Sequence, residues 1–387
     1  ISNLGRANDG SYYETQNYAI TESHEPGSTF KLVDLIAVLD DKKADTSTVY
    51  NSNGGEVQYY GRRVRDSHKG GYGKISLARG FEVSSNTVLV QSVYNSYKDN
   101  PKQFVDRINS YGLNKPLGLP IKGEGVPVIP QPGTNRWSGV ALPWMAFGYG
   151  LSVTPLQTLT LYNAVANDGV MVKPIFVSEI KEWNKTIKKF NTEVINPKIC
   201  SQETLDKVQA VLENVVKKGT GSKLYSKDFS MAGKTGTAQV NYKDKSKLYY
   251  ASSFVGYFPA DEPKYSCIIV VHKPNVAAGY YGADVAGPVF KRIAQKIFTD
   301  SPSTNHVKNI DAKVVSQEKN YSEYYKKVEK EERIIPNVKG MDGMDAVALL
   351  ENLGLKVKVI GVGRVKKQSL TSGQAFNKNQ TIIIELS

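Results

Sequence analysis

Cysteine is scarce in this chain, and long apolar runs are absent from it. Two cysteines occur among 387 residues, Cys200 and Cys267, and no Cys-x-x-Cys pair is present. Two thiols so far apart exclude a cysteine-rich metal cluster, and the hydrophobic run around Cys267 predicts a buried core thiol. No segment reaches the roughly 20 apolar residues of a membrane-spanning helix, and no signal peptide is recognisable. Because the chain starts at Ile1 without an initiator methionine, we expect it to be a piece of a longer protein.

Nucleic-acid-binding signatures are also missing, although the chain is basic. Its formal net charge is +13, from 50 basic and 37 acidic residues. A helix-turn-helix, a zinc finger or an RNA-binding motif would be needed to favour nucleic acid as the partner. Membrane surfaces and anionic polymers of a cell envelope attract a basic protein through the same long-range field. The charge therefore fits an envelope protein, and we predict no nucleic-acid partner, no metal and no cofactor.

One polar segment divides the chain. Residues 300–333 are rich in charged and small polar residues, which is typical of a linker or a solvated helix. Residues 1–299 alternate helix-like and strand-like segments, and residues 334–387 contain one helix at 345–353 with strands at 356–362 and 380–386. We therefore predict a large α+β domain, a linker and a small β-rich α+β module.

The large domain is predicted to hold antiparallel strands with flanking helices. The helical segments are 28–39, 76–83, 87–97, 155–167, 202–216 and 284–298, and the strands are 231–240, 250–258 and 265–272. The first helix is apolar on most sides, which indicates burial. Residues 116–143 are rich in proline and glycine and predict a loop.

Ser28 and Lys31 are the first candidate catalytic pair. They stand three residues apart at the start of the apolar helix, a spacing that puts both on one helix face, about 5–6 Å apart at Cβ. A serine hydroxyl needs a base, and a lysine amine serves when burial or a second cation lowers its pKa. The same spacing occurs at residues 178–181 and 316–319, where we interpret it as an ordinary surface pair. Ser28 differs because it follows Glu25-Pro26-Gly27 and because further motifs come after it.

Ser84 and Asn86 add a hydroxyl and an amide. The hydroxyl can relay a proton to a leaving amine, and the amide can hold a carbonyl of a peptide substrate. A Ser-x-Asn match also occurs at residues 303–305, and Ser84 fits equally well as the N-cap of the helix that follows. Both roles stay open for Ser84.

Lys234-Thr235-Gly236-Thr237 lies on a predicted strand. Lys234 is the second cation for Lys31, and with the hydroxyls of Thr235 and Thr237 it suits a substrate carboxylate. Gly236 lets a substrate backbone approach closely, and an extended peptide can add beside the strand. The backbone N–H groups of Thr237 and Ser28 are the candidate oxyanion hole. On its own, however, this motif fits an ordinary strand with an exposed lysine better.

In this order the three motifs predict a serine that is acylated by a peptide or a β-lactam. They resemble the motifs of penicillin-binding proteins and serine β-lactamases. Residues 25–31, 147–157 and 231–239 are similar to segments of the class B transpeptidases, and residues 335–350 resemble a PASTA domain. With that tail, Gly148-Tyr149-Gly150 resembles the division-specific branch of the class.

The resemblance implies a penicillin-binding transpeptidase domain with a helical subdomain, followed by a PASTA domain. It implies a serine-type D,D-transpeptidase: Ser28 attacks the D-Ala–D-Ala bond of a peptidoglycan stem peptide, and an amine of a neighbouring stem resolves the acyl-enzyme. β-Lactams are expected to acylate Ser28. Implied partners are a membrane glycosyltransferase and division proteins, in the bacterial envelope outside the cytoplasm. The resemblance also implies an amino-terminal membrane anchor and a pedestal domain, which we do not find in this sequence. Residues 1–4 are expected to be the last part of the first core strand of the transpeptidase domain.

Other interpretations stay open. With water as the acceptor, the same site is a D,D-carboxypeptidase or a β-lactamase, and a non-catalytic wall-binding scaffold is a third, less favoured possibility. A single PASTA-like module, rather than a tandem pair, leaves direct glycan binding open. Arg62, Arg63, Arg65 and Lys69 fit a solvated loop, or a contact with anionic groups of the substrate.

Overall fold

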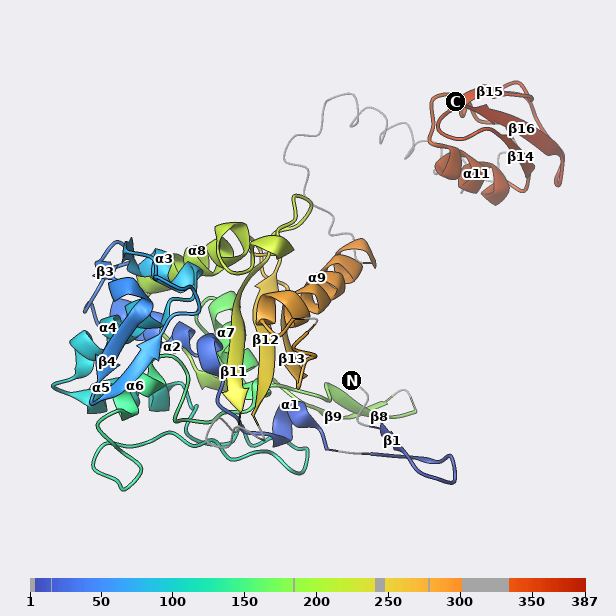
Figure 1. Cartoon of the computed structure of the whole chain (residues 1–387). Helices are drawn as coiled ribbons and strands as arrows, with labels where there is room; N and C mark the ends of the chain where they lie inside the picture. Colours follow the sequence, from blue (N-terminus) through green and yellow to red (C-terminus); the bar gives the residue numbers. More distant parts are fainter. Residues whose placement is uncertain (1–3, 15, 184, 241–247, 278, 301–333) are drawn as a thin grey trace. The chain divides into compact units, whose positions relative to one another are not determined.

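Figure 1 shows the chain as a computed structural model, which describes residues 4–14, 16–183, 185–240, 248–277, 279–300 and 334–387. The chain divides into two units, Ile1–Pro302 and Ser303–Ser387. From residue 301 onward, the predicted linker at 300–333 lies outside the described residues, as do the serine motifs at 303–305 and 316–319. No helix in the described ranges is both long enough and apolar enough to cross a bilayer.

A three-stranded antiparallel sheet lies at the centre of the first unit. Its strands follow the order β11 (Ala232–Val240), β12 (Tyr249–Phe258) and β13 (Tyr265–His272). α9 (Gly282–Asp300) packs on one face and α7 (Pro155–Ala166) on the other (Figure 1), while α8 (Gln202–Lys218) packs against β11. β12 is buried along most of its length because both faces and both edges are covered. The predicted sheet with flanking helices is confirmed.

α2 (Lys31–Asp40) is the buried axis of this unit. Every residue from Lys31 to Leu39 is buried, as the apolar sequence predicts, and α4 (Asn86–Tyr97), α5 (Pro101–Ser110) and α8 pack around it. The predicted helix starts three residues too early. Gly27–Thr29 forms a 3-10 turn, η1, and α2 begins only at Lys31. Gly27 has a φ of +57°, a left-handed conformation that glycine adopts without a steric penalty.

Short elements complete the first unit. The remaining helices are α1 (Tyr18–Thr21), α3 (Leu77–Glu82), α6 (Ala141–Met145) and the 3-10 turns η2 (Asn53–Gly55) and η3 (Ser222–Leu224). Short strands pair antiparallel as β1 (Leu4–Arg6) with β2 (Tyr12–Glu14), β3 (Val49–Asn51) with β6 (Lys74–Ser76), β4 (Glu56–Tyr59) with β5 (Arg62–Arg65), β7 (Met171–Val172) with β10 (Val194–Asn196) and β8 (Glu179–Glu182) with β9 (Lys185–Lys189).

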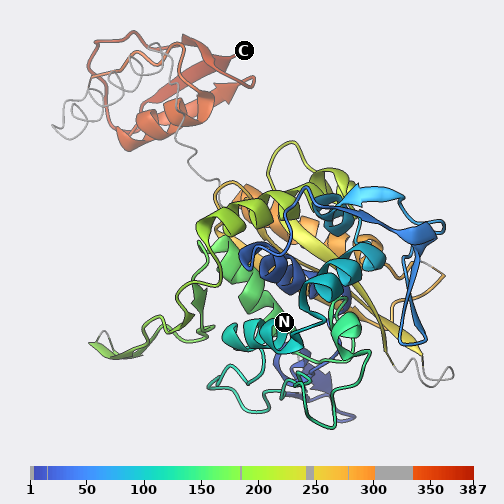
Figure 2. The same cartoon turned by 90° about the vertical axis from the view of Figure 1, so that its left-hand side faces the viewer.

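Several of these elements differ from the sequence predictions. β1 pairs with β2 alone and does not join the central sheet, so the expected core strand at residues 1–4 is wrong for Leu4. The hairpin β8–β9, yellow-green in Figure 2, extends away from the helices, and all its strand residues are exposed. α5 was not predicted, and α6 begins inside the expected loop at 116–143.

Strand β13 is less covered than its apolar sequence suggests. It is an outer strand of the sheet, and nearly all its residues are partly exposed. Cys267 is consequently half-buried rather than fully buried as predicted, and Cys200 is the buried thiol. Burial raises the pKa of Cys267 to about 11. Burial likewise raises the pKa of Cys200, to about 12, so neither thiol is reactive at neutral pH.

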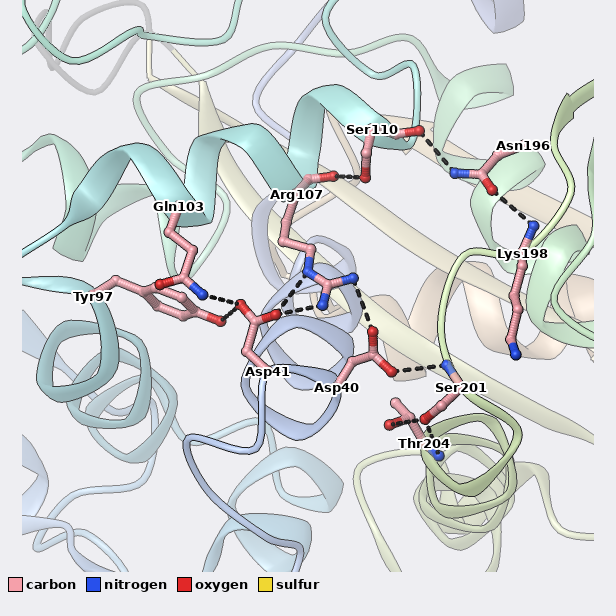
Figure 3. A network of polar contacts seen from close by, with 10 residues as sticks. All are labelled: Asp40, Asp41, Tyr97, Gln103, Arg107, Ser110, Asn196, Lys198, Ser201 and Thr204. Carbon is pink, nitrogen blue, oxygen red and sulfur yellow. Dashed lines mark hydrogen bonds and ion pairs between the residues drawn. The ribbon is translucent and has the colours of Figure 1, made fainter.

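A polar network fixes the C-terminal end of α2 (Figure 3). Arg107 of α5 lies between two carboxylates: its Nε donates to Asp41 Oδ1 at 2.9 Å, and a terminal nitrogen lies 2.8 Å from Asp40 Oδ2. The Tyr97 hydroxyl of α4 donates to Asp41 at 2.7 Å, and the N–H of Ser201 donates to Asp40 at 2.8 Å. The far end of the helix that follows Ser28 is therefore tied to three neighbouring elements.

The second unit has its own core. α11 (Gly343–Asn352) packs against a sheet in the order β14 (Lys356–Ile360), β16 (Thr381–Leu386) and β15 (Val365–Gln368). β14 runs parallel to β16, and β15 runs antiparallel to it. Ala346, Leu349 and Leu350 are buried, as the helix pattern predicts. β15 was missed because Val-Lys-Lys-Gln is short and polar.

Candidate active site

Four of the predicted site residues meet around one hydroxyl group. Lys31 Nζ donates to the Ser84 carbonyl and to Asn86 Oδ1, each at 2.7 Å, and lies 3.2 Å from Ser84 Oγ. Lys234 Nζ reaches the same Oγ from β11 at 2.8 Å and also donates to the Thr235 carbonyl at 3.1 Å. One cluster therefore combines residues of α2, of β11 and of the turn between α3 and α4.

Both lysines of the cluster are fully buried. Burial lowers the pKa of Lys31 to about 7, although the negative charges of Asp66 and Asp34 oppose this shift. Burial, and then repulsion from Lys31, lower the pKa of Lys234 well below its usual range. Close to neutral pH, a large share of Lys31 is therefore an unprotonated amine, the form that a general base requires.

The hydrogen bonds of Lys31 orient its lone pair. A neutral lysine amine keeps two N–H donors and one lone pair. The Ser84 carbonyl and Asn86 Oδ1 can only accept, so they take both donors of the neutral amine. The lone pair is left for a hydroxyl proton, and Ser84 Oγ, at 3.2 Å, is one hydroxyl within its reach. In the charged form, the third proton of Lys31 points to that same oxygen.

Ser28 lies one turn before Lys31, in η1, and is half-buried. The contacts that join the two lysines, Ser84 and Asn86 do not include its hydroxyl. Its turn is held on both sides: the Tyr162 hydroxyl donates to the Thr29 carbonyl at 2.8 Å, and the Gly27 N–H donates to the Gly148 carbonyl at 3.1 Å. Ser28 stands at the N-terminal end of α2, where the helix dipole favours negative charge.

Residues 148–150 brace this turn against β11. A Cβ on Gly148 would lie 2.0 Å from the Gly27 carbonyl oxygen, so only glycine fits there. The Gly150 N–H donates to Glu25 Oε1 at 2.8 Å, and the Gln239 N–H donates to the Tyr149 hydroxyl oxygen at 2.9 Å. Residues 148–150, which the sequence indicated only through a resemblance to class B transpeptidases, therefore link the turn of Ser28 to β11.

Gly236 packs closely against neighbouring parts of the site. A Cβ at this position would lie 2.3 Å from Ser253 Oγ and 2.8 Å from the Thr29 methyl group. That side of the strand is already filled, so the missing side chain lets η1 pack directly on β11. The glycine thereby sets how closely the turn of Ser28 approaches the strand, and the approach of a substrate backbone stays a prediction.

Thr235 and Thr237 point to the face of β11 opposite that of Lys234 and Gly236, because side chains alternate along a strand. The Thr235 hydroxyl pairs with that of Thr220 at 2.7 Å, and Thr237 Oγ1 accepts the Gly282 N–H at 3.1 Å. Thr237 keeps its own O–H, and the Thr220–Thr235 pair keeps one spare proton. Among the contacts of the described residues, two hydroxyl protons therefore have no acceptor and can bind an anionic group.

The N-cap prediction for Ser84 is wrong by one residue. Ser85 caps α4, because its Oγ accepts the Val88 N–H at 3.2 Å. Ser84 sits in the turn before it with a φ of +58°, a left-handed conformation that costs a non-glycine residue about 1–3 kcal/mol. Such strain clusters at functional sites, and here it aims the Ser84 carbonyl and hydroxyl at the two lysines.

Sequence reasoning missed two acids beside the cluster, the buried Asp34 and the partly exposed Asp66. Asp34 lies one turn after Lys31, is fully buried, and has no hydrogen-bond partner among the described residues for either oxygen. Burial raises the pKa of Asp34 well above its usual range. Asp66 follows β5 and binds the start of α4. Asp34 lies in an otherwise apolar helix and Asp66 in a polar segment, so neither showed a motif.

Comparison with known proteins decides the family. Residues 3–295 match the penicillin-binding protein transpeptidase domain, and residues 333–387 match the PASTA domain. The chain belongs to the penicillin-binding protein transpeptidase family. The predicted fold, a transpeptidase domain followed by a PASTA domain, is confirmed. Among the described residues, no group of three or more potential ligands is arranged to hold a metal ion.

Two curated relatives show the range of this family. Stage V sporulation protein D of Bacillus subtilis is 30% identical over an alignment of 390 positions, which covers 98% of this chain and 56% of the relative. Peptidoglycan D,D-transpeptidase FtsI of Escherichia coli K12 is 29% identical over 280 residues, 72% of this chain and 44% of the relative. The chain thus spans about half the length of the curated relatives that it matches.

Solved structures agree with this assignment. Penicillin-binding protein 3 of Mycobacterium tuberculosis aligns with a TM-score of 0.66 at 26% identity, over 76% of this chain and 66% of that one. The D,D-transpeptidase domain of a peptidoglycan glycosyltransferase from Eggerthella lenta aligns with a TM-score of 0.64 at 27% identity, over 73% and 68%. The Mycobacterium protein has also been solved with ampicillin and with aztreonam.

Proposed function

We propose that this chain is the catalytic part of a peptidoglycan D,D-transpeptidase with Ser28 as the nucleophile. One observation carries the proposal: Ser84 Oγ lies between two buried lysines, and burial lowers the pKa of Lys31 to about 7, so that about half of it is a free base at neutral pH. This arrangement can take a proton from a serine hydroxyl and return it to a leaving amine without water.

Acylation then follows from the cluster. The Ser28 hydroxyl loses its proton to Lys31, and its oxygen bonds to the carbonyl carbon between the two D-alanines. The carbonyl oxygen becomes an oxyanion, which the N–H groups of Ser28 and Thr237 stabilise along with the N-terminal end of α2. The C–N bond breaks, and the proton passes from Lys31 through Ser84 Oγ to the amine of the departing D-alanine.

Transpeptidation completes the reaction. The amine of a neighbouring stem peptide attacks the ester carbonyl and gives up a proton to the same relay. The C–O bond to Ser28 breaks, an amide cross-link forms, and Ser28 regains its hydroxyl proton. Water in place of the amine would give a carboxypeptidase or, with a β-lactam, a β-lactamase.

The substrate's terminal carboxylate is proposed to bind at β11. Lys234, when protonated, supplies a positive charge near the strand, and the hydroxyl protons of Thr237 and of the Thr220–Thr235 pair supply hydrogen bonds. Asn86, which accepts a hydrogen bond from Lys31, is also proposed to orient the peptide. A β-lactam carries an equivalent anionic group, and the relative solved with ampicillin and with aztreonam supports inhibition by the same route.

The wall-building context is proposed from the relatives. The division-type transpeptidase FtsI matches 72% of this chain, whereas the sporulation protein matches 98% of it. We propose cross-linking during septum-like wall synthesis, in division or in sporulation, on the outer side of the bacterial inner membrane. A membrane glycosyltransferase and division proteins are the proposed partners, and the PASTA domain is proposed to bind wall or a partner.

A fluorescent penicillin tests the nucleophile. Wild-type protein should form a covalent adduct that survives denaturation, and Ser28→Ala should form none. Ser178→Ala is the matched control because Ser178 opens a second Ser-x-x-Lys match beside an exposed hairpin. Covalent labelling of Ser28→Ala at the wild-type rate would overturn the assignment.

The acceptor needs a second measurement. The labelled acyl-enzyme should persist for minutes in buffer, because rapid hydrolysis needs a base that is positioned to activate water at the ester. Adding a D-amino acid amine together with a thioester mimic of the stem peptide should yield an amide product. Release of the penicillin within seconds would favour the β-lactamase instead.

A further inference from the structure

The residues on both sides of Asn86 are held by one carboxylate. Asp66 accepts hydrogen bonds from the Thr87 N–H at 2.9 Å, from Thr87 Oγ1 at 2.9 Å, and from Ser85 Oγ at 3.0 and 3.1 Å. Ser85 and Thr87 are both almost fully buried. Since these bonds span Asn86, Asp66 fixes the backbone from which the Asn86 side chain departs.

The neighbouring backbone fixes the amide of Asn86 itself. Asn86 Nδ2 donates to the Arg65 carbonyl at 2.7 Å, which turns Oδ1 toward Lys31 Nζ, also at 2.7 Å. Arg65 ends β5, and Val64 beside it is buried in the core. The dipeptide Arg65-Asp66 is therefore anchored, and it holds the Ser84–Asn86 motif from the side opposite the lysines.

We propose that Asp66 is a positioning residue for acylation: its carboxylate holds the Ser85–Thr87 backbone so that Asn86 and Ser84 hold Lys31 in its catalytic orientation. The inference rests on the proposed function. It goes beyond it by assigning part of the catalytic geometry to the hairpin β4–β5, which contributes no group to the reacting atoms.

The charge of Asp66 gives the proposal a distinct signature. The charged groups that face Lys31 are Asp34 on its own helix, Asp66 after β5 and Lys234 on β11. The negative charge of Asp66 acts to raise the pKa of Lys31, against the larger effect of burial. Removing that charge should therefore lower the pKa of Lys31. Loss of a merely structural contact should leave the pKa of Lys31 unchanged.

Two substitutions separate charge from geometry. Asp66→Asn keeps the shape and removes the charge, and Thr87→Val removes one hydrogen bond to Asp66 while keeping the charge. The matched control is Asp342→Asn, because Asp342 caps α11 of the second unit through the Met344 N–H. The readout is the second-order rate constant for acylation by a fluorescent penicillin from pH 5 to pH 9, together with thermal unfolding of each variant.

We expect both variants to lower the rate plateau by about 10- to 100-fold, because small misplacements of catalytic groups cost that much. Asp66→Asn should also shift the midpoint of the acid limb below that of wild type, and Thr87→Val should not. Asp342→Asn should match wild type in both measures. If Asp66→Asn does not fold, the lowered plateau with unchanged midpoint in Thr87→Val still tests the geometry.

The outcomes distinguish this proposal from the function on which it rests. Wild-type plateau and midpoint in folded Asp66→Asn, with Ser28→Ala unlabelled, would overturn the positioning role and leave the nucleophile intact. Labelling of Ser28→Ala would instead overturn the proposed function. A fall in melting temperature with no change in acylation would show that Asp66 is structural only.

Discussion

The pH dependence of acylation follows directly from the burial of Lys31. The perturbation is pH alone, applied to the wild-type protein between pH 5 and pH 9. Lys31 is fully buried, and its pKa is lowered to about 7 by that burial. Only the neutral amine can accept the proton of Ser28, so the rate should follow the neutral fraction.

The expected magnitudes come from that pKa. With a pKa of about 7, the neutral fraction is about one half at pH 7 and about one hundredth at pH 5, so acylation should be about 50-fold slower at pH 5. From pH 7 to pH 9 it should rise only about twofold. A lysine with the ordinary pKa of 10.5 would be neutral in about 3 molecules in 10⁴ at pH 7, so burial raises the neutral fraction by about 10³-fold.

The assay is acylation by a fluorescent penicillin under pseudo-first-order conditions, with circular dichroism at each pH to show that the protein stays folded. Lys31→Met is the matched variant: its residual rate should be about 10²–10⁴-fold lower and independent of pH in this range. A wild-type rate that is constant from pH 5 to pH 9 would refute Lys31 as the base. A rate that keeps rising tenfold per unit up to pH 9 would refute the lowered pKa.

The same pKa has a consequence for stability, and its sign can be worked out. The pKa of Lys31 is about 7 in the folded chain and near its ordinary 10.5 in the unfolded chain. Between these values the unfolded state binds the extra proton, so the free energy of unfolding should rise with pH over that window. Urea denaturation of wild type at pH 7 and pH 9, compared with Lys31→Met, measures this difference.

Three further predictions concern neighbouring residues. Ser84→Ala should slow acylation by about 10²-fold with a small change in stability, whereas Ser85→Ala should mainly lower stability by about 0.5–2 kcal/mol through the lost cap; equal effects on labelling would contradict this division. Gly148→Ala should lower both melting temperature and labelling because its Cβ would meet a carbonyl at 2.0 Å, whereas Gly150→Ala, with 3.9 Å of room, should show only backbone strain of about 1 kcal/mol. Asp34→Leu should raise the free energy of unfolding by about 1–3 kcal/mol in urea titrations, because it removes a buried carboxyl with no hydrogen-bond partner in the described structure, and a destabilised variant would contradict this reasoning.

The sequence was sufficient to locate the elements that carry the motifs. Apolar patterns indicated the helix after Ser28 and the strand around Lys234, and a break in the helical pattern preceded Asn86. The structure has these elements within a few residues of the predicted positions. The motif residues themselves were identifiable because Ser-x-x-Lys, Ser-x-Asn and Lys-Thr-Gly occur in order. Their catalytic roles stay predictions until the labelling experiments are done.

The supporting residues could not be predicted because their contacts join distant segments. Thr220 reaches Thr235 from the end of α8, and Asp66 reaches Thr87 from a polar segment that looks like an ordinary loop. Gly236 shows the same limit: the sequence indicates that a side chain is excluded there, but not that Thr29 and Ser253 occupy the space. Such packing partners become visible only when the chain is folded.

Ser84 Oγ contacts the amines of both Lys31 and Lys234, and this closeness affects the protonation of the two amines. Ser84 Oγ lies 3.2 Å from Lys31 Nζ and 2.8 Å from Lys234 Nζ, so the charge of one amine acts on the protonation of the other. Repulsion disfavours a proton on both amines at once. In the proposed function, a substrate carboxylate beside Lys234 would favour a proton on Lys234 and so keep Lys31 neutral. Binding of the substrate and activation of the base would then be one electrostatic event.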